Sequence, residues 1–165
     1  MNANLVLLEV GHEHKRAIRS DPQSLGPLLN VPIPEGWPEF PEAFAPSEPE
    51  RPVNATWPSY FFVLPDEGVL VGNGGFAGPP DAAGLVEIGY EIAPAFRNRG
   101  LATAAVVAMI QYAFSHNEVR AVVAHTLAEK NASNAVLKKA GMSFIVELPS
   151  PETGHVWQWR KDRVG

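Results

Sequence analysis

The feature that most restricts the fold is the stretch from Leu85 to His116, where a strand pattern changes directly into a helix pattern. Residues 85–92 alternate between apolar positions and positions that are acidic or glycine, which predicts a β-strand with two different faces. Pro94 ends this strand, and the Ala-rich residues from Arg99 to about His116 predict a long helix. Any fold of this chain must therefore place the start of a helix within a few residues of the end of this strand.

Further strands and helices are predicted on both sides of this stretch. Before it come a strand at 5–10, helices at 12–20 and 23–30, and strands at 59–64 and 68–72, the last able to continue to Phe76. After it come a strand at 119–126, a helix at 132–140 stopped by Gly141, and strands at 143–148 and 155–160. A meander followed by a strand-helix-strand unit predicts an α/β (α+β) fold, with a mixed, mostly antiparallel sheet of about seven strands and flanking helices.

Between residues 31 and 58, proline interrupts the chain at eight positions. Proline removes backbone donors, so we expect irregular structure there. Four large aromatic residues within the segment predict a packed loop rather than a free linker: Trp37, Phe40, Phe44 and Trp57.

The composition excludes several classes of protein. A length of 165 residues predicts a single domain over 1–165, and a net charge of −5 provides no basic surface for nucleic acid or an anionic membrane. The absence of cysteine excludes disulfides, thiolate metal ligands and cysteine nucleophiles, and suits a cytoplasmic protein. No signal peptide is expected at the N-terminus, and the most apolar run, 102–110, is too short to span a bilayer.

The turn before the long helix is a candidate anion site. The first amides of a helix lack intrahelical partners and lie at the positive end of its dipole, so they suit a phosphate group. Gly100 would let the backbone approach a ligand, Ala102 keeps the next turn narrow, and Arg97 and Arg99 would add charge-assisted contacts. Glycine and arginine are also common at helix starts without a ligand, and spacing alone leaves both interpretations open.

Three segments carry a resemblance to a known family. Arg97-x-x-Gly100-x-Ala102 resembles the Gln/Arg-x-x-Gly-x-Gly/Ala motif of the GNAT superfamily of N-acetyltransferases. Residues 86–92 resemble the fourth strand of that superfamily. Residues 128–142 resemble its second motif, most like the branch that acetylates the N-terminal alanine of ribosomal proteins, although Lys130 stands where that branch has asparagine and Met142 replaces its phenylalanine. The resemblance covers 69–142, and the preceding residues match only in general character.

The resemblance implies a binding core for acetyl-CoA, without a metal, at about 69–142 and an acceptor-side region at about 12–58. In the superfamily the motif's amides hold the pyrophosphate of coenzyme A, and the pantetheine arm lies along the fourth strand where it diverges from the fifth. The residues expected to contact the cofactor are therefore Ile92, Ala93, Arg97, Arg99, Gly100, Leu101, Ala102, Thr103, Asn131 and Asn134.

Acyl transfer from a thioester to an amine needs a neutral amine, a donor for the oxyanion and a proton for the leaving thiolate. With no cysteine and no Gly-x-Ser-x-Gly elbow, direct attack by the amine is the natural hypothesis. Glu87 and Glu91 share one strand face and are candidates for the base, with Glu87 preferred. They are equally interpreted as exposed members of an amphipathic strand.

The resemblance also indicates a candidate for the acid. Many GNAT members carry a tyrosine four residues before the glycine of the second motif, and this chain has Leu137 there. In the ribosomal branch a serine lies near the sulfur, and Ser133 matches it. The same serine is also a candidate N-cap for a helix starting at Asn134, and both interpretations stay open.

Other polar residues receive simpler interpretations. His125, on the predicted strand 119–126, is interpreted as structural, and the neighbours His12, Glu13 and His14 lack a third ligand in register for a metal. Trp157 and Trp159 share one face of the last strand and are expected in the core, although that strand could also pair in a homodimer.

The acceptor is expected to lie against residues 23–58 and to be a primary amine: a protein N-terminus, an amino acid or a small amine. Two alternatives keep the same fold. One is an N-acyltransferase for a longer acyl-CoA, and the other is a non-catalytic CoA-binding regulatory module.

Overall fold

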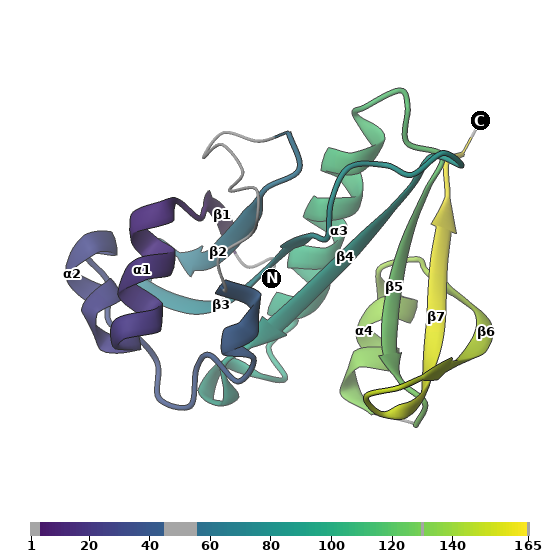
Figure 1. The fold of residues 1–165 in the computed structure, drawn as a ribbon. Helices are drawn as coiled ribbons and strands as arrows, with labels where there is room; N and C mark the ends of the chain where they lie inside the picture. Colours follow the sequence, from purple (N-terminus) through teal and green to yellow (C-terminus); the bar gives the residue numbers. More distant parts are fainter. Residues whose placement is uncertain (1–3, 45–55, 130, 165) are drawn as a thin grey trace. The chain divides into compact units, whose positions relative to one another are not determined.

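The computed structural model describes residues 4–44, 56–129 and 131–164. Figure 1 shows the strands and helices that these residues form. In chain order they are β1 (Val6–Glu9), α1 (His12–Ser20), the 3-10 helix η1 (Pro22–Ser24), α2 (Leu25–Leu29), η2 (Pro41–Phe44), β2 (Ser59–Leu64), β3 (Val69–Phe76), β4 (Leu85–Ile92), η3 (Pro94–Phe96), α3 (Leu101–Phe114), β5 (Ala121–Leu127), α4 (Ala132–Lys139), β6 (Ser143–Ser150) and β7 (Gly154–Asp162).

The seven strands form a mixed sheet in the order β1-β2-β3-β4-β5-β7-β6. The pairs β1–β2, β2–β3, β5–β7 and β6–β7 are antiparallel, and β4–β5 is parallel. The predicted mixed, mostly antiparallel seven-stranded sheet is therefore confirmed.

The chain divides into two compact units. Unit 1 comprises Met1–Gly75 with Tyr90–Ala105, and unit 2 comprises Phe76–Gly89 with Val106–Gly165. The strands β3 and β4 and the helix α3 contribute residues to both units. The assignment of 1–165 to one domain stays a prediction.

The core of unit 1 forms where α1, α2 and the proline-rich segment pack on β2. Ile18 of α1 and Leu25 of α2 are buried in one cluster with Phe61 of β2. The rings of Trp37 and Phe44 lie with their centroids 6.3 and 6.0 Å from that of Phe61. Burying these aromatic side chains on a sheet face keeps residues 31–44 packed despite their irregular backbone, whereas residues 45–55 lie outside the described part of the chain.

The aromatic residues of the proline-rich segment bear out the packed-loop prediction with one exception. Trp37, Phe44 and Trp57 are buried, but the Phe40 side chain is 50% exposed. Phe40 is held by its backbone instead, since its N–H donates to the carboxylate of Glu91 at 3.0 Å.

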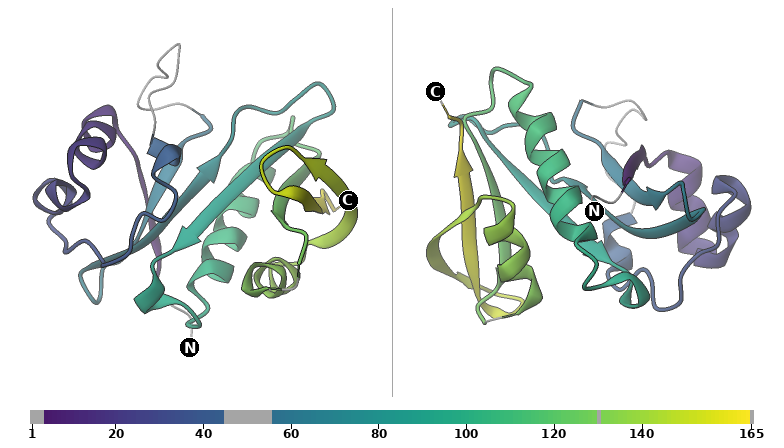
Figure 2. Two further views of the ribbon diagram at one scale, coloured as in Figure 1. Left: turned by 60° about the horizontal axis from the view of Figure 1, so that its bottom comes forward. Right: turned by 180° about the vertical axis from the view of Figure 1, so that it is seen from behind.

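In unit 2, α4 covers one face of the sheet formed by β5 and β7 (Figure 2). Thr126 of β5 donates to the Asn134 side chain of α4 at 3.0 Å, and buried Trp159 of β7 donates to the Thr126 hydroxyl at 3.1 Å. Because side chains alternate along a strand, His125 and Gln158 must point to the opposite face. The predicted inward position of Trp159 is confirmed, since its side chain is 2% exposed.

The helices follow their predicted positions, with local corrections at their ends. The predicted helix 23–30 is split into η1 and α2, because Asp21 caps a 3-10 turn through Gln23 N–H at 3.1 Å. The end of α4 is as predicted: Gly141 has φ +92°, and Met142 N–H donates to Leu137 O at 2.9 Å. That geometry is the usual glycine-terminated helix end.

Candidate active site

The turn after β4 presents a helix start with free amides in unit 1. Gly100 has φ +77°, and its carbonyl accepts from Ala104 N–H at 3.1 Å, so Gly100 is the residue that caps α3. The N–H groups of Leu101, Ala102 and Thr103 have no acceptor among the described residues. A Cβ built on Gly100 would meet nothing within 4 Å, so this side of the turn is open. These are the properties expected of an anion site at a helix start.

The start of α3 differs by two residues from its prediction. We expected the helix from Arg99, but it begins at Leu101. The reason lies in the backbone of the turn, since Asn98 at φ 64° and Gly100 at φ 77° are both left-handed and interrupt helical geometry. Glycine at position 100 therefore serves the turn conformation as well as access to the amides.

Both arginines of the turn have carboxylate partners in unit 1. Arg97 donates through Nη2 to Glu39 Oε2 at 3.1 Å, and through Nε to the carbonyl oxygen of Ile92 at 3.0 Å. Arg99 donates through Nη2 to Glu67 Oε2 at 2.6 Å, and its hydrogen bond to that carboxylate raises the pKa of the guanidinium. The predicted anion-contacting side chains therefore already hold anionic groups of the protein itself.

Ile92 and Ala93, expected to pair with the pantetheine arm, are partly engaged within the protein. Ala93 N–H donates to Val71 O at 2.8 Å, and Ile92 O accepts from Arg97 as described above. These two backbone groups tie the end of β4 to β3 and to the turn.

Glu91 is not an exposed strand residue, which corrects one of the two interpretations given to it. Its side chain is buried and accepts from Glu39 N–H at 2.9 Å and from Phe40 N–H at 3.0 Å. Burial raises the pKa of this carboxyl, and the two backbone hydrogen bonds oppose that rise. Glu91 thus anchors the proline-rich segment to β4. Beside it, Trp37 Nε1 donates to Asn73 Oδ1 of β3 at 2.8 Å.

In unit 2, the parallel pairing of β4 with β5 is short. It runs from Leu85↔Ala121 to Glu87↔Val123, although β5 continues to Leu127 in its pairing with β7. The unpaired continuation begins directly after Glu87. This agrees with the expectation that the fourth and fifth strands diverge.

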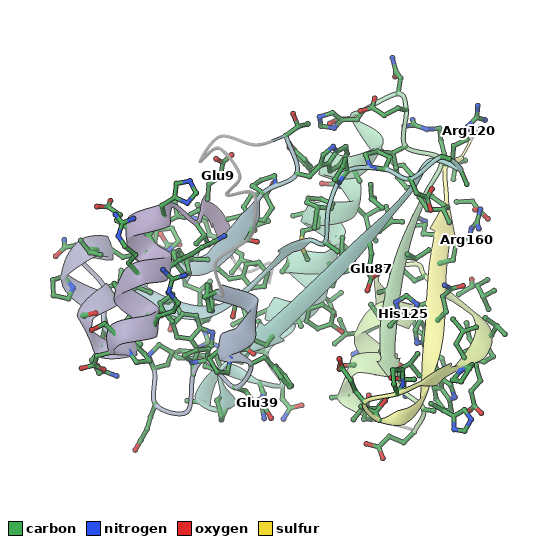
Figure 3. The ribbon with its side chains drawn as sticks, viewed as in Figure 1. Glu9, Glu39, Glu87, Arg120, His125 and Arg160 are labelled. Atoms are coloured by element: carbon green, nitrogen blue, oxygen red, sulfur yellow. The ribbon has the colours of Figure 1, made fainter. Side chains whose placement is uncertain are left out.

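Glu87 lies at that point and contacts a residue that we had interpreted as structural. Glu87 Oε2 lies 3.1 Å from His125 Nδ1, and His125 Nε2 lies 3.3 Å from Gln158 Nε2. Figure 3 labels Glu87 on β4 and His125 on β5. The Glu87 side chain is 47% exposed. Period-2 alternation places each of these residues on a strand face, but only the register of β4, β5 and β7 brings the three together.

The start of α4 decides one of the alternatives for Ser133. The N-cap is Asn131, whose side chain accepts from Asn134 N–H at 3.3 Å, so the proposed capping role of Ser133 was wrong. Ser133 is half-buried in the first turn, and its hydroxyl has no hydrogen-bond partner among the described residues. Lys130, which replaces the family's asparagine, lies outside the described residues.

The two predicted cofactor-contacting asparagines have structural partners. Beyond the capping by Asn131, buried Asn134 accepts from Thr126 and donates through Nδ2 to Glu129 O at 2.6 Å. These bonds tie Thr126 and Glu129 to the first turn of α4.

Neither a metal site nor a membrane span is found in the described part of the chain. No three or more His, Cys, Asp or Glu residues gather there in an arrangement that could hold an ion. No helix within 4–44, 56–129 and 131–164 has the length and apolar character needed to cross a bilayer.

The sequence model of the Acetyltransferase (GNAT) domain matches residues 11–143 of this chain. The chain belongs to the GNAT acetyltransferase family. This is the family that the motif at Arg97–Ala102 resembles, and its match spans both the turn before α3 and the segment that starts α4.

One curated relative is similar in sequence over part of the chain. The uncharacterized N-acetyltransferase YjdG of Bacillus subtilis (strain 168) is 32% identical over 97 residues, which are 59% of this chain and 56% of that protein. The chain thus matches little more than half the length of this curated relative.

Solved GNAT structures have the same fold. The ribosomal L7/L12 alpha-N-protein acetyltransferase RimL, in complex with coenzyme A, has a TM-score of 0.68 and 16% identity, covering 98% of this chain and 95% of that one. The aminoglycoside acetyltransferase AAC(6')-Ib, in complex with coenzyme A and kanamycin, has a TM-score of 0.68 and 15% identity, covering 97% and 95%. Since these two proteins differ in substrate, the likeness establishes the GNAT fold alone, and the ribosomal branch stays a prediction.

Proposed function

We propose that the protein is an acetyl-CoA-dependent N-acetyltransferase that moves the acetyl group to a primary amine by direct attack. The observation that carries the proposal is the open, Gly100-capped start of α3, with three unpartnered amides, in a chain of the GNAT family. A diphosphate is the ligand that such a helix start suits best.

The proposal assigns binding of the diphosphate to unit 1. The amides of Leu101, Ala102 and Thr103 donate to its oxygens, and Arg97 and Arg99 exchange Glu39 and Glu67 for phosphate oxygens. Each of these carboxylates lies within hydrogen-bond distance of its arginine and is about half exposed, so the exchange requires no buried charge to be uncovered.

The proposal assigns the two proton transfers to unit 2. The ammonium form of the acceptor loses a proton to Glu87, and the neutral nitrogen then attacks the thioester carbonyl carbon. The C–N bond forms and the C–S bond breaks. After the attack the nitrogen carries one proton too many and releases it. This proton reaches the departing thiolate of coenzyme A through water and the Ser133 hydroxyl, whose O–H donates to the sulfur. A free hydroxyl in the first turn of α4 supports this role for Ser133.

We infer the class of acceptor from the chemistry of amine acetylation and not from the substrate of any one similar protein. RimL acts on a ribosomal protein, and AAC(6')-Ib is bound to kanamycin, so both a protein N-terminus and a small amine are compatible with this fold. Both acceptors present a primary amine, which is the class that we propose. An assay with a panel of acceptors distinguishes a protein N-terminus from a small amine.

Binding is tested first. Acetyl-CoA should raise the thermal midpoint, as any ligand of the native state does, and should protect the amides of 101–103 from hydrogen exchange. Pantetheine, which lacks the diphosphate, is the control and should protect none of them. If acetyl-CoA protected these amides no better than pantetheine does, the start of α3 would not be the diphosphate site.

Turnover is tested by release of free thiol from acetyl-CoA with peptides, amino acids and polyamines as acceptors. Release with any amine excludes the non-catalytic regulatory module. Competition by longer acyl-CoA thioesters in the same assay separates acetyl transfer from transfer of a larger group.

A further inference from the structure

Three polar side chains form a directed chain across neighbouring strands of unit 2. Glu87 comes from β4 and His125 from β5 (Figure 3), and Gln158 comes from β7. In the sheet His125 lies directly opposite Gln158, and Glu87 is paired with Val123, two residues before His125. Side chains at such directly opposed and diagonal positions are close enough to interact. The contacts are 3.1 Å from Glu87 Oε2 to His125 Nδ1 and 3.3 Å from His125 Nε2 to Gln158 Nε2.

The chemistry of these contacts defines where the protons lie. Gln158 Nε2 is an amide donor, so the tautomer that satisfies both contacts of a neutral imidazole accepts at Nε2 and carries the proton on Nδ1. Nδ1–H then donates to Glu87 Oε2. Oε1 of Glu87 is left without a hydrogen-bond partner among the described residues.

We propose that His125 is a positioning residue for Glu87 and that Gln158 fixes the imidazole in its Nδ1–H form. Resting on the function proposed above, this assigns Glu87 Oε1 as the oxygen that takes the proton from the acceptor. The proton leaves the ammonium nitrogen, its N–H bond breaks, and an O–H bond forms at Oε1 while Oε2 keeps the hydrogen bond from Nδ1–H.

A surface ion pair is the simplest competing explanation, and it makes a different prediction. An ion pair needs a doubly protonated imidazole, in which Nε2–H has to meet an acceptor. In the structure the amide nitrogen of Gln158 faces Nε2, and the other charged groups on this strand face pair with each other, as Arg160 Nε donates to Asp162 Oδ1 at 2.7 Å. The His125 side chain is 26% exposed, so its orientation is largely set by its neighbours.

The imidazole proton can be located directly, without an activity assay. Long-range nitrogen–proton NMR at about pH 8, well above the ordinary histidine value of about 6.5, should show His125 as the Nδ1–H tautomer. The exposed His155 of β7 serves as the internal control and should show the ordinary mixture. Gln158→Leu should shift His125 toward Nε2–H. An Nε2–H or doubly protonated His125 in the unaltered protein would overturn the proposal.

Kinetics test positioning through rescue by a conservative variant. His125→Leu removes the donor and should lower kcat by about tenfold to a hundredfold, as loss of a hydrogen bond to a charged group does, with little change in either KM. His125→Asn keeps an N–H close to the Nδ1 position and should recover most of that loss. The matched control His155→Leu should leave kcat unchanged.

The outcomes separate this proposal from the function on which it rests. If the unaltered protein binds no acetyl-CoA and releases no thiol, the proposed function fails, and the NMR result alone decides the tautomer. If it turns over but His125→Leu and His125→Asn have the same kcat, His125 does not position Glu87 and the inference fails.

Discussion

Arg97 donates through Nη2 to Glu39 Oε2 at 3.1 Å, although 58 positions separate the two residues in the chain. The backbone N–H of Glu39 also donates a hydrogen bond to the buried carboxylate of Glu91. The proline-rich segment, expected on the acceptor side, is therefore joined by hydrogen bonds to the turn that carries the family motif. An anion that binds at Arg97 must compete with Glu39.

This competition predicts the effect of Glu39→Gln. Removing the carboxylate frees the Arg97 guanidinium, so affinity for coenzyme A should rise by up to about fivefold at low salt, the range of an exposed ion pair. The gain should fade at high salt, because exposed charges are screened. Calorimetric titration at two ionic strengths measures both. Glu35→Gln changes the same charge in the same segment and should leave affinity unaltered; equal gains in the two variants would refute the role of Glu39.

The left-handed backbone at position 100 predicts separable effects on stability and binding. Gly100→Ala forces a Cβ into φ +77° and should cost about 1–2 kcal/mol of unfolding free energy. It should also weaken coenzyme A binding, since the Cβ occupies the open side of the turn. Gly68→Ala is the matched control, with φ +65° and nothing within 4 Å of its Cβ. Urea unfolding should show a similar loss for both, while titration should show weakened binding only for Gly100→Ala.

The start of α4 predicts opposite behaviour for two neighbouring side chains. Asn131→Ala removes the N-cap and should cost about 1 kcal/mol of unfolding free energy. Ser133→Ala removes a hydroxyl that has no hydrogen-bond partner among the described residues. It should change the unfolding free energy by no more than about 0.5 kcal/mol. If the hydroxyl serves the leaving thiolate, Ser133→Ala lowers kcat at unchanged stability. An unaltered kcat in that variant would remove Ser133 from the mechanism.

The buried carboxyl of Glu91 should make the unfolding free energy depend on pH. Burial raises its folded-state pKa above the ordinary 4.5, so between 4.5 and the raised value the folded protein binds more protons than the unfolded chain. Its contribution to the unfolding free energy is therefore fully present below 4.5 and is lost as pH rises through the folded value. Comparing urea unfolding of the unaltered protein with Glu91→Gln across this window measures the difference, which should decrease as pH rises. A constant difference would show that Glu91 titrates alike in both states.

Local patterns predicted most of the fold. Alternation identified β4, and the Ala-rich run and Gly141 identified α3 and α4, because these signals depend on neighbours within one or two turns of the chain. The boundaries were less well predicted where one residue's backbone decides them, as at Gly100, whose left-handed φ delays α3 to Leu101. The N-cap of α4 is a case of the same kind, since the structure has Asn131 there rather than Ser133.

By itself the sequence determined the order of the main strands and helices and the family, since each depends on short-range spacing. Only the tertiary structure decided the partners of the charged groups. Glu91 is buried under the backbone of Glu39 and Phe40, while Glu87, four residues earlier, faces His125. Strand alternation gives both carboxylates the same face, but register and packing across distant segments set what each one meets, and no local pattern encodes them.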